Sequence, residues 1–163
     1  MAGRWQMRYE FKVDMSKFAR VLSDLPAAIE RAKRVALNQI GNTIKNRAID
    51  SFKDESLRPS PWPPRKNNAD PDRPLLYKHG DMKNTIGYKV TAPDTVFVGT
   101  KAGYAKFHQT GTRNMPARPI FPVKDGNLTP DVHQVITRKV EKAFSDALPK
   151  GSIPRPIWPG SNA

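Results

Sequence analysis

Alternating apolar and polar residues mark the first predicted element of the chain. From Trp5 to Val13 every second residue is apolar, and the positions between are polar or charged: Gln6, Arg8, Glu10 and Lys12. A period of two is typical of a strand with one buried face. We therefore predict a strand over Trp5–Val13, followed by a short amphipathic turn that begins near Ser16.

Apolar residues spaced three and four apart predict two long helices. The first helix begins near Pro26, and its apolar stripe comprises Ile29, Ala32, Ala36, Ile40, Ile44, Ala48 and Phe52. Its opposite face carries Arg31, Arg34, Asn38, Lys45 and Asn46, which form either a solvated face or a surface for DNA or a neighbouring subunit. The second helix begins at Thr129-Pro130, and its apolar face comprises Val132, Val135, Ile136, Val140, Ala143, Phe144 and Ala147.

Proline disrupts the pattern between these helices. Six prolines lie between Lys53 and Pro74, so we predict an extended arm over residues 53–78. Within it, Trp62 suggests a docking contact, and an arm that reaches a partner subunit is one interpretation.

A hairpin follows the arm. Ile86, Tyr88 and Val90 share one face of a strand, Ala92-Pro93-Asp94 interrupts it, and Thr95–Thr100 resumes as a second strand. Two strands alone are marginally stable, so the sheet requires Trp5–Val13 or an edge from another subunit.

The run from Val98 to Val123 joins a strand end, a short helix that begins near Ala102, a stop at Gly111 and a proline-bounded extended segment. We expect Tyr104 and Phe107 to anchor this helix on the sheet. Arg118 lies between prolines and makes either an internal ion pair or an intersubunit contact.

Together these elements predict an α+β domain. A small antiparallel sheet packs against the long N-terminal amphipathic helix and the C-terminal helix, with the proline-rich arm as an appendage. We expect one domain over residues 1–149 and a proline-rich tail over residues 150–163, in which Trp158 is exposed.

Composition narrows the possible functions. The chain has 28 Lys and Arg against 15 Asp and Glu, a formal charge of +13 that favours a polyanionic neighbour such as nucleic acid or an acidic protein surface. It has no cysteine, and its histidines, His79, His108 and His133, lack metal-ligand spacing. No nucleophile motif, secretory signal or membrane span is evident. We therefore expect no enzymatic activity, no metal or other cofactor and no membrane contact.

One set of motifs resembles a known family, the phage virion morphogenesis proteins that act in tail completion and are related to head–tail connector or neck proteins. The matching motifs are Trp62-Pro63, Leu75-Leu76, His79-Gly80-Asp81-Met82 with Ile86, Val98-Gly99-Thr100, Tyr104-Ala105, His108-Gln109 with Gly111, and Met115-Pro116-Ala117-Arg118-Pro119. The resemblance implies a ring-forming virion component at the head–tail junction or tail end, with no catalytic residues.

From this resemblance and the composition we expect a homo-oligomeric ring, a hexamer, that contacts neighbouring neck, connector and tail proteins and makes non-specific contact with packaged DNA. The alternatives are a basic DNA-binding protein and a tail terminator ring. The candidate interface residues are Trp62, Tyr104, Phe107, His108, Gly111, Arg118 and Trp158.

Overall fold

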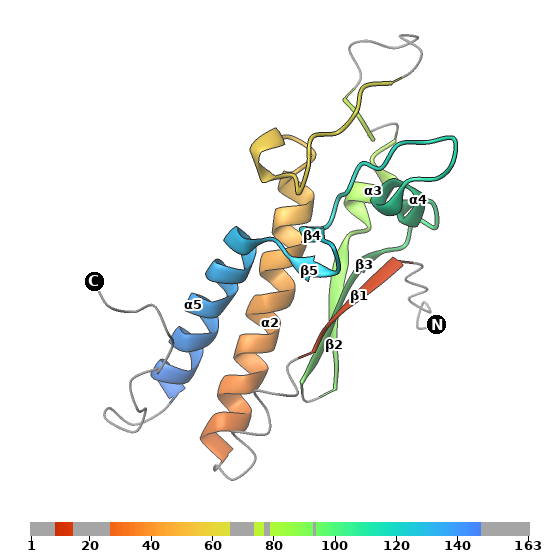
Figure 1. Ribbon diagram of the computed structural model, residues 1–163. Coiled ribbons are helices and arrows are strands. Elements are labelled where there is room, and N and C mark those ends of the chain that lie inside the picture. The colour runs from red at the N-terminus through yellow and green to blue at the C-terminus, as the bar shows by residue number, and fades with distance from the viewer. Residues whose placement is uncertain (1–8, 15–26, 66–73, 77–78, 93, 148–163) are drawn as a thin grey trace, which may run out of the picture.

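The structure, a computed structural model, describes residues 9–14, 27–65, 74–76, 79–92 and 94–147 (Figure 1). In chain order its elements are β1 (Tyr9–Asp14), α2 (Ala27–Asp50), the 3-10 helix η1 (Glu55–Leu57), α3 (Asp81–Asn84), β2 (Gly87–Ala92), β3 (Thr95–Thr100), α4 (Ala105–Thr110), β4 (Val123–Lys124), β5 (Asn127–Leu128) and α5 (Pro130–Ala147). The predicted α+β class is confirmed.

The main sheet has three antiparallel strands in the order β1-β3-β2. The predicted hairpin is therefore completed within the chain, because β1 pairs along the whole of β3, from Tyr9 opposite Thr100 to Asp14 opposite Thr95. The central strand β3 is apolar and β-branched, and Val96 and Val98 are fully buried. Of the predicted first strand, Trp5–Arg8 lies outside the described residues, as does the turn after Ser16.

Helix α2 is the centre of the fold, with the sheet on one side and α5 on the other (Figure 1). Because both sides are covered, Leu37 and Gly41 are buried as well as the predicted stripe. A Cβ atom at Gly41 would lie 2.3 Å from Cδ2 of Tyr88, so glycine is required for β2 to approach this closely. The single apolar stripe predicted from sequence was therefore too narrow.

Helix α5 runs antiparallel to α2. Arg47 near the end of α2 pairs with Asp131 at the start of α5, and the Nζ atom of Lys139 donates to the Oγ1 atom of Thr43 at 2.7 Å. The predicted apolar face of α5 is buried except for Val135, which is 41% exposed, and Ala147, which is partly buried. None of the described helices is long and apolar enough to cross a membrane.

A small hairpin of β4 and β5 precedes α5 and was not predicted. Its turn places Asp125 and Gly126 at φ 51° and 79°, the left-handed conformations that an Asp-Gly turn favours. The buried side chains of α2, β3, α4 and α5 belong to one hydrophobic cluster, which also includes Trp62 from the arm.

Candidate assembly surface

The root of the arm folds back onto the chain's own core. The Trp62 side chain is 7% exposed, its ring lies edge-on to Phe52 with centroids 5.7 Å apart, and its Nε1–H donates to the carbonyl of Pro119 at 2.8 Å. The guanidinium of Arg58 lies 4.0 Å from the Trp62 ring centroid. The docking contact that the sequence suggested for Trp62 is therefore made within the same chain.

Arg118 holds the same segment from the other side. It is buried, and its Nε and Nη2 atoms donate to the carbonyls of Pro63 and Pro64, each at 2.8 Å. Burial lowers the pKa of the Arg118 guanidinium, and nearby Arg65 lowers it further. In the described part of the chain no carboxylate pairs with Arg118. It donates to backbone carbonyls and does not form the internal ion pair that was one of its two predicted contacts.

Gln109 fixes the inner side of α4, a role that the sequence analysis did not assign to it. Its Oε1 atom accepts from the N–H groups of Ile120 and Phe121 at 2.9 and 3.0 Å, and its Nε2 donates to the Phe121 carbonyl. The amide therefore replaces strand partners for a buried extended segment. The sequence signal for Gln109 was its place in the His108-Gln109 motif, two residues before Gly111.

Gly111 ends α4 as predicted. It has φ 75°, and its N–H donates to the carbonyl of Phe107 at 2.9 Å. A Cβ atom there would lie 2.9 Å from the backbone nitrogen of Ala117, so both the turn and the close approach require glycine. The chain then reverses through a tight Thr112–Met115 bridge and returns across α4.

The outer side of α4 carries two exposed aromatic side chains. Tyr104 and Phe107 are 46% and 44% exposed, whereas Ala105 and Gln109 face the core. The expectation that both aromatic residues anchor α4 on the sheet is therefore wrong. The Lys106 Nζ atom lies 4.8 Å from the Phe107 ring centroid. We call the exposed residues Tyr104, Lys106, Phe107 and Arg113 the α4 surface.

His108 lies between the inner and outer sides of α4. Its ring is edge-on to Tyr104, with centroids 5.9 Å apart. Burial lowers the pKa of the imidazole below its ordinary value, and the Arg118 charge lowers it further, so His108 is neutral at neutral pH. Its Nδ1 atom is buried and makes no hydrogen bond to any described residue.

The stretch of sequence that contains α4 carries charge of one sign. From Thr95 to Lys124 the sequence contains no Asp or Glu and five basic residues: Lys101, Lys106, Arg113, Arg118 and Lys124. Among the described residues no three His, Cys, Asp or Glu side chains are grouped as metal ligands would be. The arrangement is suited to binding a macromolecular surface. Trp158, the remaining candidate, lies outside the described residues.

The comparison with known families gives the class of this chain. The model of the phage virion morphogenesis family matches residues 13–145, which include the whole α4 region and all of the described helices except the last two residues of α5. The chain therefore belongs to the phage virion morphogenesis family. It is a phage protein of virion morphogenesis. Searches of curated proteins and of solved structures gave no match.

Proposed function

We propose that this chain is a structural subunit of a tailed phage that acts in tail completion or head–tail joining and assembles into a homo-oligomeric ring, a hexamer. Membership of the morphogenesis family supports a virion role. The ring, its position at the head–tail junction or tail end, and its neck, connector and tail neighbours belong to the proposal.

The α4 surface carries this proposal. Two aromatic side chains that are nearly half exposed lie on a helix of six residues whose other side is fixed by Gln109. Aromatic residues and arginine are enriched at protein interfaces, and a fixed backbone reduces the entropy lost on binding. A ring contact of this kind joins two different surfaces of adjacent copies.

Mass photometry of purified protein at micromolar concentration tests the ring. We expect the wild-type chain to form a closed oligomer and Phe107→Ser to shift it towards monomer. Val135→Ser is the matched control, because Val135 is similarly exposed but lies on α5. Wild-type protein that is monomeric both in solution and in isolated tails would overturn the ring. If Phe107→Ser and Val135→Ser form the oligomer to the same extent, the α4 surface is not part of the contact between subunits.

A basic DNA-binding protein is the second candidate, favoured by the net charge of +13 and by the acid-free stretch around α4. It predicts tight binding to duplex DNA that weakens steeply with added salt, because each phosphate contact releases counterions. The structural proposal predicts weak retention that disappears near physiological salt. A salt-titrated binding assay with a duplex of mixed sequence separates the two.

The position of the chain in the phage particle distinguishes the proposed function from the remaining alternative, a tail terminator ring. Imaging of virions that carry a labelled chain should place the label at the head–tail junction or tail end. A label at the tail end beneath a complete neck would favour the terminator.

A further inference from the structure

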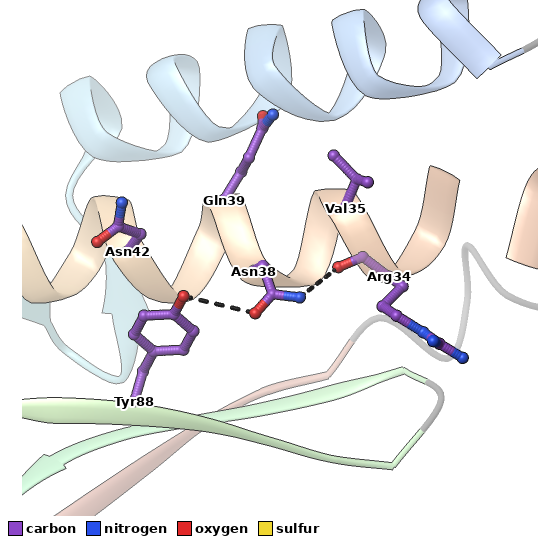
Figure 2. Close-up of a pocket in the computed structure, with 6 residues that line it drawn as sticks. All are labelled: Arg34, Val35, Asn38, Gln39, Asn42 and Tyr88. Carbon is purple, nitrogen blue, oxygen red and sulfur yellow. Dashed lines mark hydrogen bonds between the residues drawn. The ribbon is translucent and has the colours of Figure 1, made fainter. Parts of the chain in front are cut away.

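A shallow groove lies along the exposed face of α2, between α5 and β2 (Figure 2). It has a volume of about 340 Å³ and is lined by Arg34, Val35, Asn38, Gln39, Asn42 and Tyr88. Val35 in its floor is 45% exposed, one of the few large apolar side chains that the described fold leaves open. We call this feature the α2 groove.

Two amide side chains of the α2 groove, which carry hydrogen-bond donors, have no hydrogen-bond partner among the described residues. Asn38 is engaged, because its Nδ2 donates to the Arg34 carbonyl at 2.8 Å and its Oδ1 accepts from the Tyr88 hydroxyl at 3.4 Å. Gln39 and Asn42, in contrast, make no side-chain hydrogen bond to any described residue. Figure 2 shows Gln39 directed towards α5 and Asn42 one turn further along α2. Their amides are therefore available to the backbone of an occupant.

The end of α5 lies beside this groove. Because α5 is antiparallel to α2, Ala147 comes next to the N-terminal half of α2, where the groove begins (Figure 1). The groove runs from Arg34 to Asn42, about 12 Å along the helix axis. A polyproline segment with the length of Ala147 to Trp158 would span about 34 Å. The tail is long enough to reverse at Gly151 and extend along the groove.

The composition of the tail matches the groove. Residues 153–159, Ile-Pro-Arg-Pro-Ile-Trp-Pro, contain three prolines, which lack backbone N–H groups while keeping their carbonyl acceptors. Such a segment requires donors from its binding site, and the free amides of Gln39 and Asn42 supply them. Apolar Ile157 and Trp158 require an apolar floor, which Val35 and the Tyr88 ring offer. Proline-rich peptides are recognised elsewhere by grooves with an aromatic wall.

We propose that residues 153–159 of the C-terminal tail bind in the α2 groove of the same chain. Ile157 and Trp158 cover Val35 and Tyr88, and the tail carbonyls accept hydrogen bonds from Gln39 and Asn42. This proposal does not depend on ring formation.

Engineered disulfides in the full-length chain test the proposal, because the chain has no native cysteine. One variant carries Gln39→Cys and Gly160→Cys. Its control carries Lys124→Cys and Gly160→Cys, because Lys124 is exposed on β4, outside the groove. We expect an intramolecular disulfide to form under mild oxidation at least about tenfold faster in the groove variant, owing to its higher effective concentration. Peptide mass spectrometry of the non-reduced protein measures the rates.

Two further measurements make the result decisive. Adding Ile157→Ser and Trp158→Ser to the groove variant should lower its rate to that of the control, while circular dichroism verifies the fold. Equal rates in the groove and control variants would overturn the proposal. Disulfides that form only between chains, detected by mixing isotopically light and heavy protein, would overturn it as well. If the chain is monomeric and still forms the intramolecular disulfide rapidly, the proposed ring is wrong and the proposed binding of the tail is supported.

Discussion

The inner and outer sides of α4 use similar residues for opposite purposes. On the inner side, Trp62, Gln109 and Arg118 are buried and join the arm, the helix and the extended segment through hydrogen bonds to backbone groups. On the outer side, Tyr104 and Phe107 are nearly half exposed. The comparison teaches that an aromatic residue or an arginine in a conspicuous motif does not indicate an interface until its contacts within the chain are known.

The largest expected effect concerns Trp62. Trp62→Ala should lower the free energy of unfolding by about 3–5 kcal/mol, because it empties a core site between Phe52 and Pro119. Trp62→Phe keeps a ring against Phe52 and loses the Nε1 hydrogen bond, at a cost of about 1 kcal/mol. Urea denaturation at fixed protein concentration measures both variants. A loss below about 1 kcal/mol for Trp62→Ala would contradict the internal docking of the arm.

Gln109→Leu should give the next largest loss, roughly 3 kcal/mol of unfolding free energy. The leucine fills similar space but removes the buried amide oxygen that accepts from the N–H groups of Ile120 and Phe121. Thermal or urea unfolding measures the loss, and Gln134→Leu on the exposed face of α5 serves as the control. Equal stability of the two variants would show that α4 does not depend on this amide.

A smaller effect is expected from acidification. The pKa of His108 is lowered in the folded state, so the unfolded chain binds the proton more readily, and stability falls as pH decreases below the ordinary value of 6.5 towards the lowered one. The lowered pKa values of Asp54 and Asp131 act only below their ordinary 3.8, outside this window. Between pH 7 and 5, wild type should lose more stability than His108→Gln. Parallel urea-midpoint profiles would rule out His108 as the cause.

Substitutions on the outer side of α4 should change stability the least. Tyr104→Ser and Phe107→Ser should each alter the free energy of unfolding by less than about 0.5 kcal/mol, as is usual for exposed positions. Phe121→Ser, a fully buried counterpart, should be strongly destabilising. Chemical denaturation of the three variants at a concentration that favours monomer gives the comparison. A large loss for Phe107→Ser would mean that its ring is part of the core.

The local pattern of apolar and polar residues predicted helices and strands well where it extended over several residues. The span of β3 agrees with the prediction, and α5 begins at the proline that was expected to open it. The β4–β5 hairpin was missed because two residues per strand give no periodicity, although Asp125-Gly126 is a recognisable turn signal.

The candidate surface was predicted less well, because the decisive contacts are long-range. Trp62 and Pro119 are 57 positions apart, and nothing local reveals that they meet. On α4 the spacing of Tyr104 and Phe107 looked like a buried face. The inner side of α4 instead carries the small Ala105 and the amide of Gln109, because the extended segment at Ile120 and Phe121 approaches α4 closely there. In a helix of six residues, periodicity cannot distinguish the two sides.

The base of the arm offers a practical site for engineering. The Nη2 atom of Arg65 donates to the carbonyl of Pro74 at 2.8 Å, so the two positions that bracket residues 66–73 are tied directly to each other. Because the entropic cost of closing a longer loop grows only logarithmically, extra sequence inserted there should leave the domain in place. An epitope or fluorescent tag could enter the chain at this point with both α4 and the α2 groove left unaltered.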